Sequence, residues 1–184
     1  MLVVTLALLL SACGGTPPQP IDVITPAPWP GGTSATPQTT PSTEPTQEEL
    51  SAQAEQAYRA FFNEWKRLEL EGGADEPTPI LLENGAEKYL EGVMLFLREQ
   101  KAIGYTVDGE MPTTQVVPRP GETDQESDPR LTLAVCEDST LSWHTDDLGR
   151  HQGTRSQGLV FLRIVDGRPK VVWANTDVVE TCAL

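Results

Sequence analysis

The two histidines of the sequence, His144 and His151, lie on either side of two aspartates, Asp146 and Asp147. Imidazole and carboxylate groups bind divalent transition metals and transfer protons near neutral pH. A hydrolytic zinc site needs three well-placed protein ligands, and no third histidine or nearby cysteine supports this pair. We therefore expect solvated turn residues at these positions, and we predict no metal site and no cofactor.

A second chemical signal is the cysteine that follows the first apolar run. Residues 2–10 are too few to cross about 30 Å of hydrocarbon as a helix, and they have the length of a signal-peptide core. The sequence Leu10-Ser11-Ala12-Cys13 resembles the lipobox of bacterial lipoproteins. That resemblance implies that residues 1–12 are removed and that Cys13 carries a diacylglycerol. The alternative is an ordinary secretory signal with an unmodified thiol.

Once the lipobox accounts for Cys13, two of the three cysteines are left, Cys136 and Cys182. A disulfide persists outside the reducing cytoplasm, so we predict that these two pair and attach the C-terminal tail to a central strand. The alternative is a nucleophilic thiol at Cys136. It would need a neighbouring histidine and no partner available to oxidise it.

The chain is strongly acidic, with 27 acidic and 13 basic residues and a formal net charge of -14. Binding to DNA or RNA requires clustered lysine and arginine to neutralise phosphates, so we predict no nucleic-acid partner. The same charge disfavours docking on anionic lipid headgroups. Membrane attachment would therefore depend on the lipid on Cys13, which places the protein on the outer face of the cell membrane.

Composition divides the mature chain into a tether and a domain. Residues 13–46 are rich in Pro, Thr, Gly, Ser and Gln, and they cannot bury enough apolar surface to fold, so we expect a disordered tether. Residues 47–184 have the apolar content of one domain.

Within that domain, helical periodicity comes first. Thr46 and Glu49 fit a capping box, and the helix that follows is expected to stop at Gly72-Gly73. A short Pro-bounded segment and a second long helix, ending at Gly104, come next. Beyond Gly104 the apolar period changes toward 2, and Asp166-Gly167 signals a hairpin. The predicted strands are 105–107, 114–118, 131–136, 141–145, 159–165 and 171–176.

Helices followed by antiparallel strands indicate an α+β fold with the helices packed on one face of a sheet. The stretches Ala102–Glu110 and Leu133–Ser139, then Val172-Trp173 followed by a closing cysteine, resemble actinobacterial lipoproteins of the nuclear transport factor 2-like superfamily. That resemblance implies a cone: about three helices against one strongly curved antiparallel sheet, often around a pocket.

Some enzymes of that superfamily hold a carboxylate or a His–Asp pair inside the cone. The clearest charged residues for such a role are Glu64 and Arg163, but both fit a solvent-facing position equally well, so no catalytic residue is transferred. We predict a non-catalytic module that binds a small apolar ligand or an envelope protein. The alternatives are an isomerase- or dehydratase-like enzyme and a structural spacer of an envelope complex. The predicted pocket aromatics are Tyr58, Trp65, Tyr89 and Trp173.

Overall fold

The computed structural model describes residues 44–124 and 127–184 of the chain. Contacts divide the chain into two units, Met1–Pro41 and Ser42–Leu184, and the described residues all belong to the second. The predicted cleavage site, Cys13 and the tether up to residue 43 lie outside the described residues.

Helix α1 (Gln47–Leu70) begins at the predicted capping box. The Glu49 backbone N–H donates to Thr46 Oγ1 at 3.2 Å, and the Thr46 backbone N–H donates to Glu49 Oε2 at 2.7 Å. Both bonds satisfy amide groups that the first helical turn would leave without partners. The predicted start of this helix is therefore confirmed.

Two shorter helices come after α1. Helix α2 (Pro79–Asn84) has Thr78 as its N-cap and a proline at its start, where the missing N–H costs nothing. Helix α3 (Glu87–Ile103) ends at Gly104, whose φ of 70° lies in the left-handed region that glycine adopts without strain. The predicted stop at Gly104 is confirmed.

The strands form two antiparallel sheets. One has three strands in the order β1-β4-β5, and the other has four in the order β2-β3-β6-β7. The strands of the first sheet are β1 (Thr106–Gly109), β4 (Ser142–Asp146) and β5 (Gly149–Gln152). Those of the second are β2 (Thr113–Pro118), β3 (Thr132–Asp138), β6 (Arg155–Val165) and β7 (Arg168–Val179).

The prediction of about three helices on one strongly curved sheet that closes as a cone is wrong. The strands divide between two sheets, and one long helix, α1, is accompanied by shorter ones. The chain breaks the ladder between β1 and β2, where Gly109 has a φ of 105° and Pro112 lacks a backbone donor. At Gly153 a Cβ would stand 2.1 Å from the Ser139 carbonyl oxygen, so the β3–β4 and β5–β6 connections lie close against each other there.

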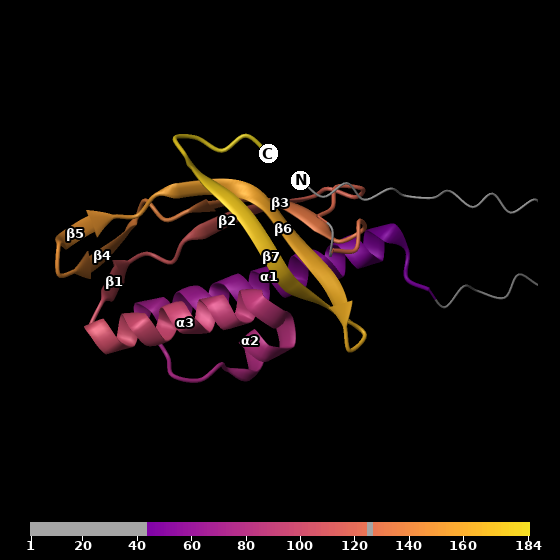
Figure 1. The fold of residues 1–184 in the computed structure, drawn as a ribbon. Helices are drawn as coiled ribbons and strands as arrows, with labels where there is room; N and C mark the ends of the chain where they lie inside the picture. The colour runs from indigo at the N-terminus through magenta and orange to yellow at the C-terminus, as the bar shows by residue number, and fades with distance from the viewer. Residues whose placement is uncertain (1–43, 125–126) are drawn as a thin grey trace, which may run out of the picture. The chain divides into compact units, whose positions relative to one another are not determined.

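The core lies between the helices and one face of the four-stranded sheet (Figure 1). Alternate residues of β3 and β6 point toward the helices and meet the apolar stripe of α1. Gly85 also pairs with Val171, which brings the α2–α3 connection against β7. The fully buried side chains include Tyr58, Phe61, Phe62, Leu81, Leu97, Leu133, Val135, Val160, Leu162 and Val171. Within the described residues, no helix has the length and apolar character needed to span a membrane.

Candidate functional site

A carboxylate lies on the core-facing side of the four-stranded sheet. Glu137 follows Leu133 and Val135 in alternation along β3, and it stands across from Ser156 on β6. The Tyr58 hydroxyl, from α1, donates to Glu137 Oε1 at 2.8 Å, and the Ser156 hydroxyl donates to Oε2 at 3.3 Å. The sheet and the long helix thus hold one carboxylate between them with both oxygens hydrogen-bonded.

The surroundings of Glu137 disfavour its charged form. Burial raises the pKa of Glu137, while the Tyr58 hydrogen bond and the Lys66 ammonium partly oppose that rise. Burial also raises the pKa of the Tyr58 and Tyr89 hydroxyls, and the nearby Glu137 charge raises both further. The two tyrosines therefore remain neutral donors at physiological pH.

A small cavity of about 60 Å³ lies beyond this cluster, between α1 and the three-stranded sheet. Lys66 contributes to its wall and forms an ion pair with Glu69 at 2.8 Å, with the ammonium 4.3 Å from the centre of the Trp65 ring. Tyr105 and His144, also in the wall, stack with ring centres 5.9 Å apart. A cavity of this size admits a few water molecules.

The structure places three of the four predicted pocket aromatics in the helix layer of the core. Tyr58 is 2% exposed, Tyr89 packs against Phe61 with ring centres 5.6 Å apart, and Trp65 packs edge-on against Phe62. Trp173 lies on β7 and is 52% exposed. Its cross-strand partner, Phe161, lies between two core-facing residues of β6, so Trp173 belongs to the sheet face away from the helices.

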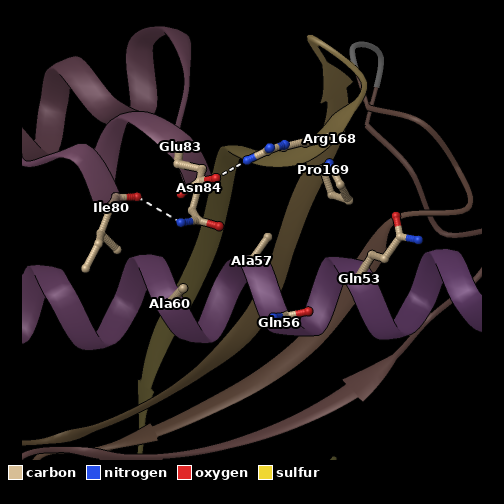
Figure 2. Close-up of a pocket in the computed structure, with 9 residues that line it drawn as sticks. All are labelled: Gln53, Gln56, Ala57, Ala60, Ile80, Glu83, Asn84, Arg168 and Pro169. Atoms are coloured by element: carbon tan, nitrogen blue, oxygen red, sulfur yellow. Dashed lines mark hydrogen bonds and ion pairs between the residues drawn. The ribbon is translucent and has the colours of Figure 1, made fainter.

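A surface groove runs beside α1 (Figure 2). It has a volume of about 410 Å³ and lies between α1, α2 and the β6–β7 hairpin. Ala57 and Ala60 point from α1 toward α2 and form an apolar floor, and the Asn84 amide is directed into the space between the two helices. The remaining lining residues are Gln53, Gln56, Ile80, Glu83, Arg168 and Pro169.

The polar groups of this groove carry no net charge. Glu83 forms an ion pair with Arg168, and the Asn84 side-chain amide donates to the Ile80 carbonyl at 2.9 Å. A second hollow of about 570 Å³ shares Ala60 and Ile80 with the groove and extends past Met111. Ile80 and Met111 are 44% and 40% exposed. Together the two hollows form a continuous apolar-floored surface along α1.

The two cysteines of the domain lie at disulfide-bonding distance, with Cα atoms 6.0 Å apart. The tail that contains Cys182 is also held by hydrogen bonds. The Gln157 side-chain amide donates to the Ala183 carbonyl at 3.0 Å, and the Ala183 N–H donates to Gln157 Oε1 at 2.6 Å. Arg155 donates to the Glu180 carbonyl at 3.0 Å. The C-terminal tail is thereby attached to β3 and β6.

The histidines face each other across the β4–β5 hairpin, since His144 and His151 are cross-strand partners. His151 Nε2 is 3.5 Å from Asp146 Oδ1. In the part of the chain that the structure describes, no group of three or more His, Cys, Asp or Glu side chains is placed to hold a metal ion.

The two charged residues considered for a catalytic role pair elsewhere. Glu64 accepts two hydrogen bonds from Arg67, at 2.8 and 2.9 Å, and this pairing leads the causes that lower its pKa. Arg163 donates to Glu87 at 3.1 Å. Glu137 was missed because the Glu137-Asp138-Ser139 stretch resembles a turn. The alternation Leu133, Val135, Glu137 is the signal that would have placed it on the core face.

No protein-family model matches the chain, and no curated protein matches it. Among solved structures, a de novo designed β-sheet protein solved by NMR is similar at 18% identity and a TM-score of 0.36, covering 71% of this chain and 89% of the design. A similarity this low supports no statement about fold or function.

Proposed function

We propose that this protein is a lipoprotein attached by Cys13 to the outer face of the cell membrane, and that its domain is a non-catalytic module that binds an envelope protein. The groove beside α1 is the proposed binding surface. The proposal depends on the resemblance of residues 10–13 to a lipobox. It does not depend on the cone-shaped fold, which the structure does not have.

The proposal rests above all on the positions of Cys136 and Cys182. A cysteine pair at disulfide-bonding distance suits an oxidising compartment outside the cytoplasm. It also leaves Cys13, in its lipobox context, as the cysteine available for lipid attachment. Both features support the same location.

The packing of the interior favours a protein partner over a small apolar ligand. Tyr58, Phe61 and Phe62 are each at most 2% exposed and occupy the space between α1 and the sheet. The larger hollows lie on the surface, with an alanine floor and a neutral polar rim. A shallow surface of this kind, with exposed Ile80 and Met111, is suited to a protein segment that supplies apolar side chains and backbone polar groups.

Site-specific photo-crosslinking in the native host tests the proposal. A photoreactive residue replaces Gln56, in the groove, and in a matched control it replaces Glu91, exposed on α3. We expect a discrete adduct from position 56 that Ala60→Arg abolishes and that position 91 does not give. Equal adducts from both positions, or an adduct that survives Ala60→Arg, would contradict the proposal.

One observation favours an enzyme as the second candidate, namely the hydrogen-bonded pair of Tyr58 and Glu137 with its raised carboxyl pKa. Native mass spectrometry of the protein recovered from its host separates the two functions. A retained small molecule that Glu137→Gln releases would favour the enzyme. A protein that carries no small molecule, with crosslinking confined to the groove, would favour the binding module.

A further inference from the structure

Strand β7 forms an edge of the four-stranded sheet. It pairs with β6 on one side, and on the other side only its beginning is covered, by the Gly85–Val171 bridge and the Ala86 N–H bond to the Val171 carbonyl. Within residues 44–124 and 127–184, no strand pairs with the outer side of 173–179. In Figure 1 this part of β7, in yellow, rises away from the helices.

The uncovered edge has few of the features that usually prevent edge-to-edge pairing, since Asp177 is the one charged residue of 173–179. Residues 171–179 contain no lysine, arginine or proline. Trp173 is 52% exposed and Val178 is 72% exposed, and they lie on opposite faces of the strand. Both are large apolar side chains at a strand edge whose backbone groups are available for a ladder.

We propose that a second copy of this chain pairs with this edge, β7 against β7 in antiparallel order, around a two-fold axis at Thr176. Such an axis, perpendicular to the sheet, keeps the same residue on the same face in both copies. Residues that oppose each other in the two copies are then an even number of positions apart in the sequence. The registers that pair most of the uncovered residues 173–179 are those centred on residue 175, 176 or 177.

The register centred on Thr176 matches side chains of the same kind. Trp173 lies opposite Val179, and Ala174 lies opposite Val178, so apolar residues meet on both faces of the sheet. Asn175 lies opposite Asp177, where the amide can donate to the carboxylate. Apolar and hydrogen-bonding cross-strand pairs stabilise antiparallel sheets.

The neighbouring registers are unfavourable. A register centred on Asp177 places two carboxylates directly opposite each other, and like charges at opposing positions destabilise a sheet. A register centred on Asn175 places Asp177 against Trp173. The sequence of the edge therefore selects the Thr176 register, which joins the two four-stranded sheets into one. This inference does not depend on the proposed function.

Cysteine crosslinking of the complete chain in its host tests the register. In the proposed pairing Thr176 faces its own copy, at a Cα separation that a disulfide can span. We expect Thr176→Cys to give a species of twice the mass on non-reducing gels after mild oxidation. Asn175→Cys and Asp177→Cys should not link alone, but should link to each other when both variants are expressed together. No link at position 176, or equal links at all three positions, would overturn the proposal.

A charge exchange gives an independent test by sedimentation of the complete chain in detergent. Asn175→Asp places carboxylates opposite each other twice in the dimer, and we expect the dissociation constant to rise on the order of ten-fold. The double variant Asn175→Asp/Asp177→Asn restores the pairing, and we expect it to regain the native value. A purely local effect on the monomer would not be rescued in this way. A native chain that is monomeric at all concentrations, or a single variant equal to the native chain, would refute the dimer.

Discussion

Removing the link between Cys136 and Cys182 should produce a large and specific loss of stability. The two residues are 46 positions apart in the sequence. On the chain-entropy view, a crosslink that closes a segment of this length lowers the entropy of the unfolded chain by an amount equivalent to about 4 kcal/mol. We expect the double variant Cys136→Ala/Cys182→Ala to lose about that much free energy of unfolding, apart from the smaller packing loss at buried Cys136.

Urea unfolding of the native chain, with and without a phosphine reductant, measures the same quantity without a change of side chain. The reduced native chain and the double variant should agree within about 1 kcal/mol. The reductant should leave the double variant unchanged, which is the control for other effects. A loss below about 1 kcal/mol on reduction would refute the reasoning. It would mean that the crosslink does not restrict the unfolded chain as the chain-entropy view requires.

Three further variants test the interior and the helix start, each by urea unfolding. Burial raises the pKa of Glu137, so between 4.5 and that raised value the folded chain keeps a proton that the unfolded chain has lost. Glu137 therefore makes native stability fall as the pH rises through this window. Glu137→Gln should remove that contribution, so the free energy of unfolding of the variant should increase relative to that of the native chain as the pH rises. If the free energies of unfolding of the two proteins change with pH in parallel, the raised pKa of Glu137 is contradicted. Leu81→Ala, at a fully buried position of α2, should lower the free energy of unfolding by about 2–5 kcal/mol. A loss below about 1 kcal/mol would contradict the tight packing at this position, because it would mean that neighbouring side chains fill the cavity. Thr46→Ala should cost about 0.5–2 kcal/mol through loss of the α1 cap, whereas Ser at this position should be nearly neutral.

The helices and the tight turn could be predicted because local sequence determines them. Thr46 and Glu49 cap α1, and Gly104 ends α3, whatever the rest of the chain does. Asp166 and Gly167 have φ values of 53° and 78°, as the hairpin that joins β6 to β7 requires. Each of these signals depends on residues close together in the chain.

The division of the strands into two sheets could not be predicted, because alternation reports which face a residue occupies and not which strand lies beside it. Strand β5 was missed since Gly149–Gln152 is polar and has no apolar alternation. Strand β3 continues through Asp138, beyond its predicted end. That extension places Glu137 on the core face, where Tyr58, far away in the sequence, supplies its hydrogen bond.

The groove beside α1 depends on packing that the sequence does not display. Its lining comes from α1, α2 and the β6–β7 hairpin, and the Arg168–Glu83 ion pair is one of the contacts that join the hairpin to α2. Ala57 and Ala60 belong to the same helix as the aromatic stripe, and their small size leaves the groove open (Figure 2). A sequence pattern records small residues without indicating which element they face.

The location of the protein at the membrane is tested most directly by mass spectrometry of the N-terminal peptide of the mature chain, isolated from the host envelope. We expect the peptide to begin at Cys13 and to carry the added mass of a diacylglycerol in thioether linkage. A mature chain that begins elsewhere, or that has an unmodified Cys13 thiol, would contradict the lipoprotein proposal.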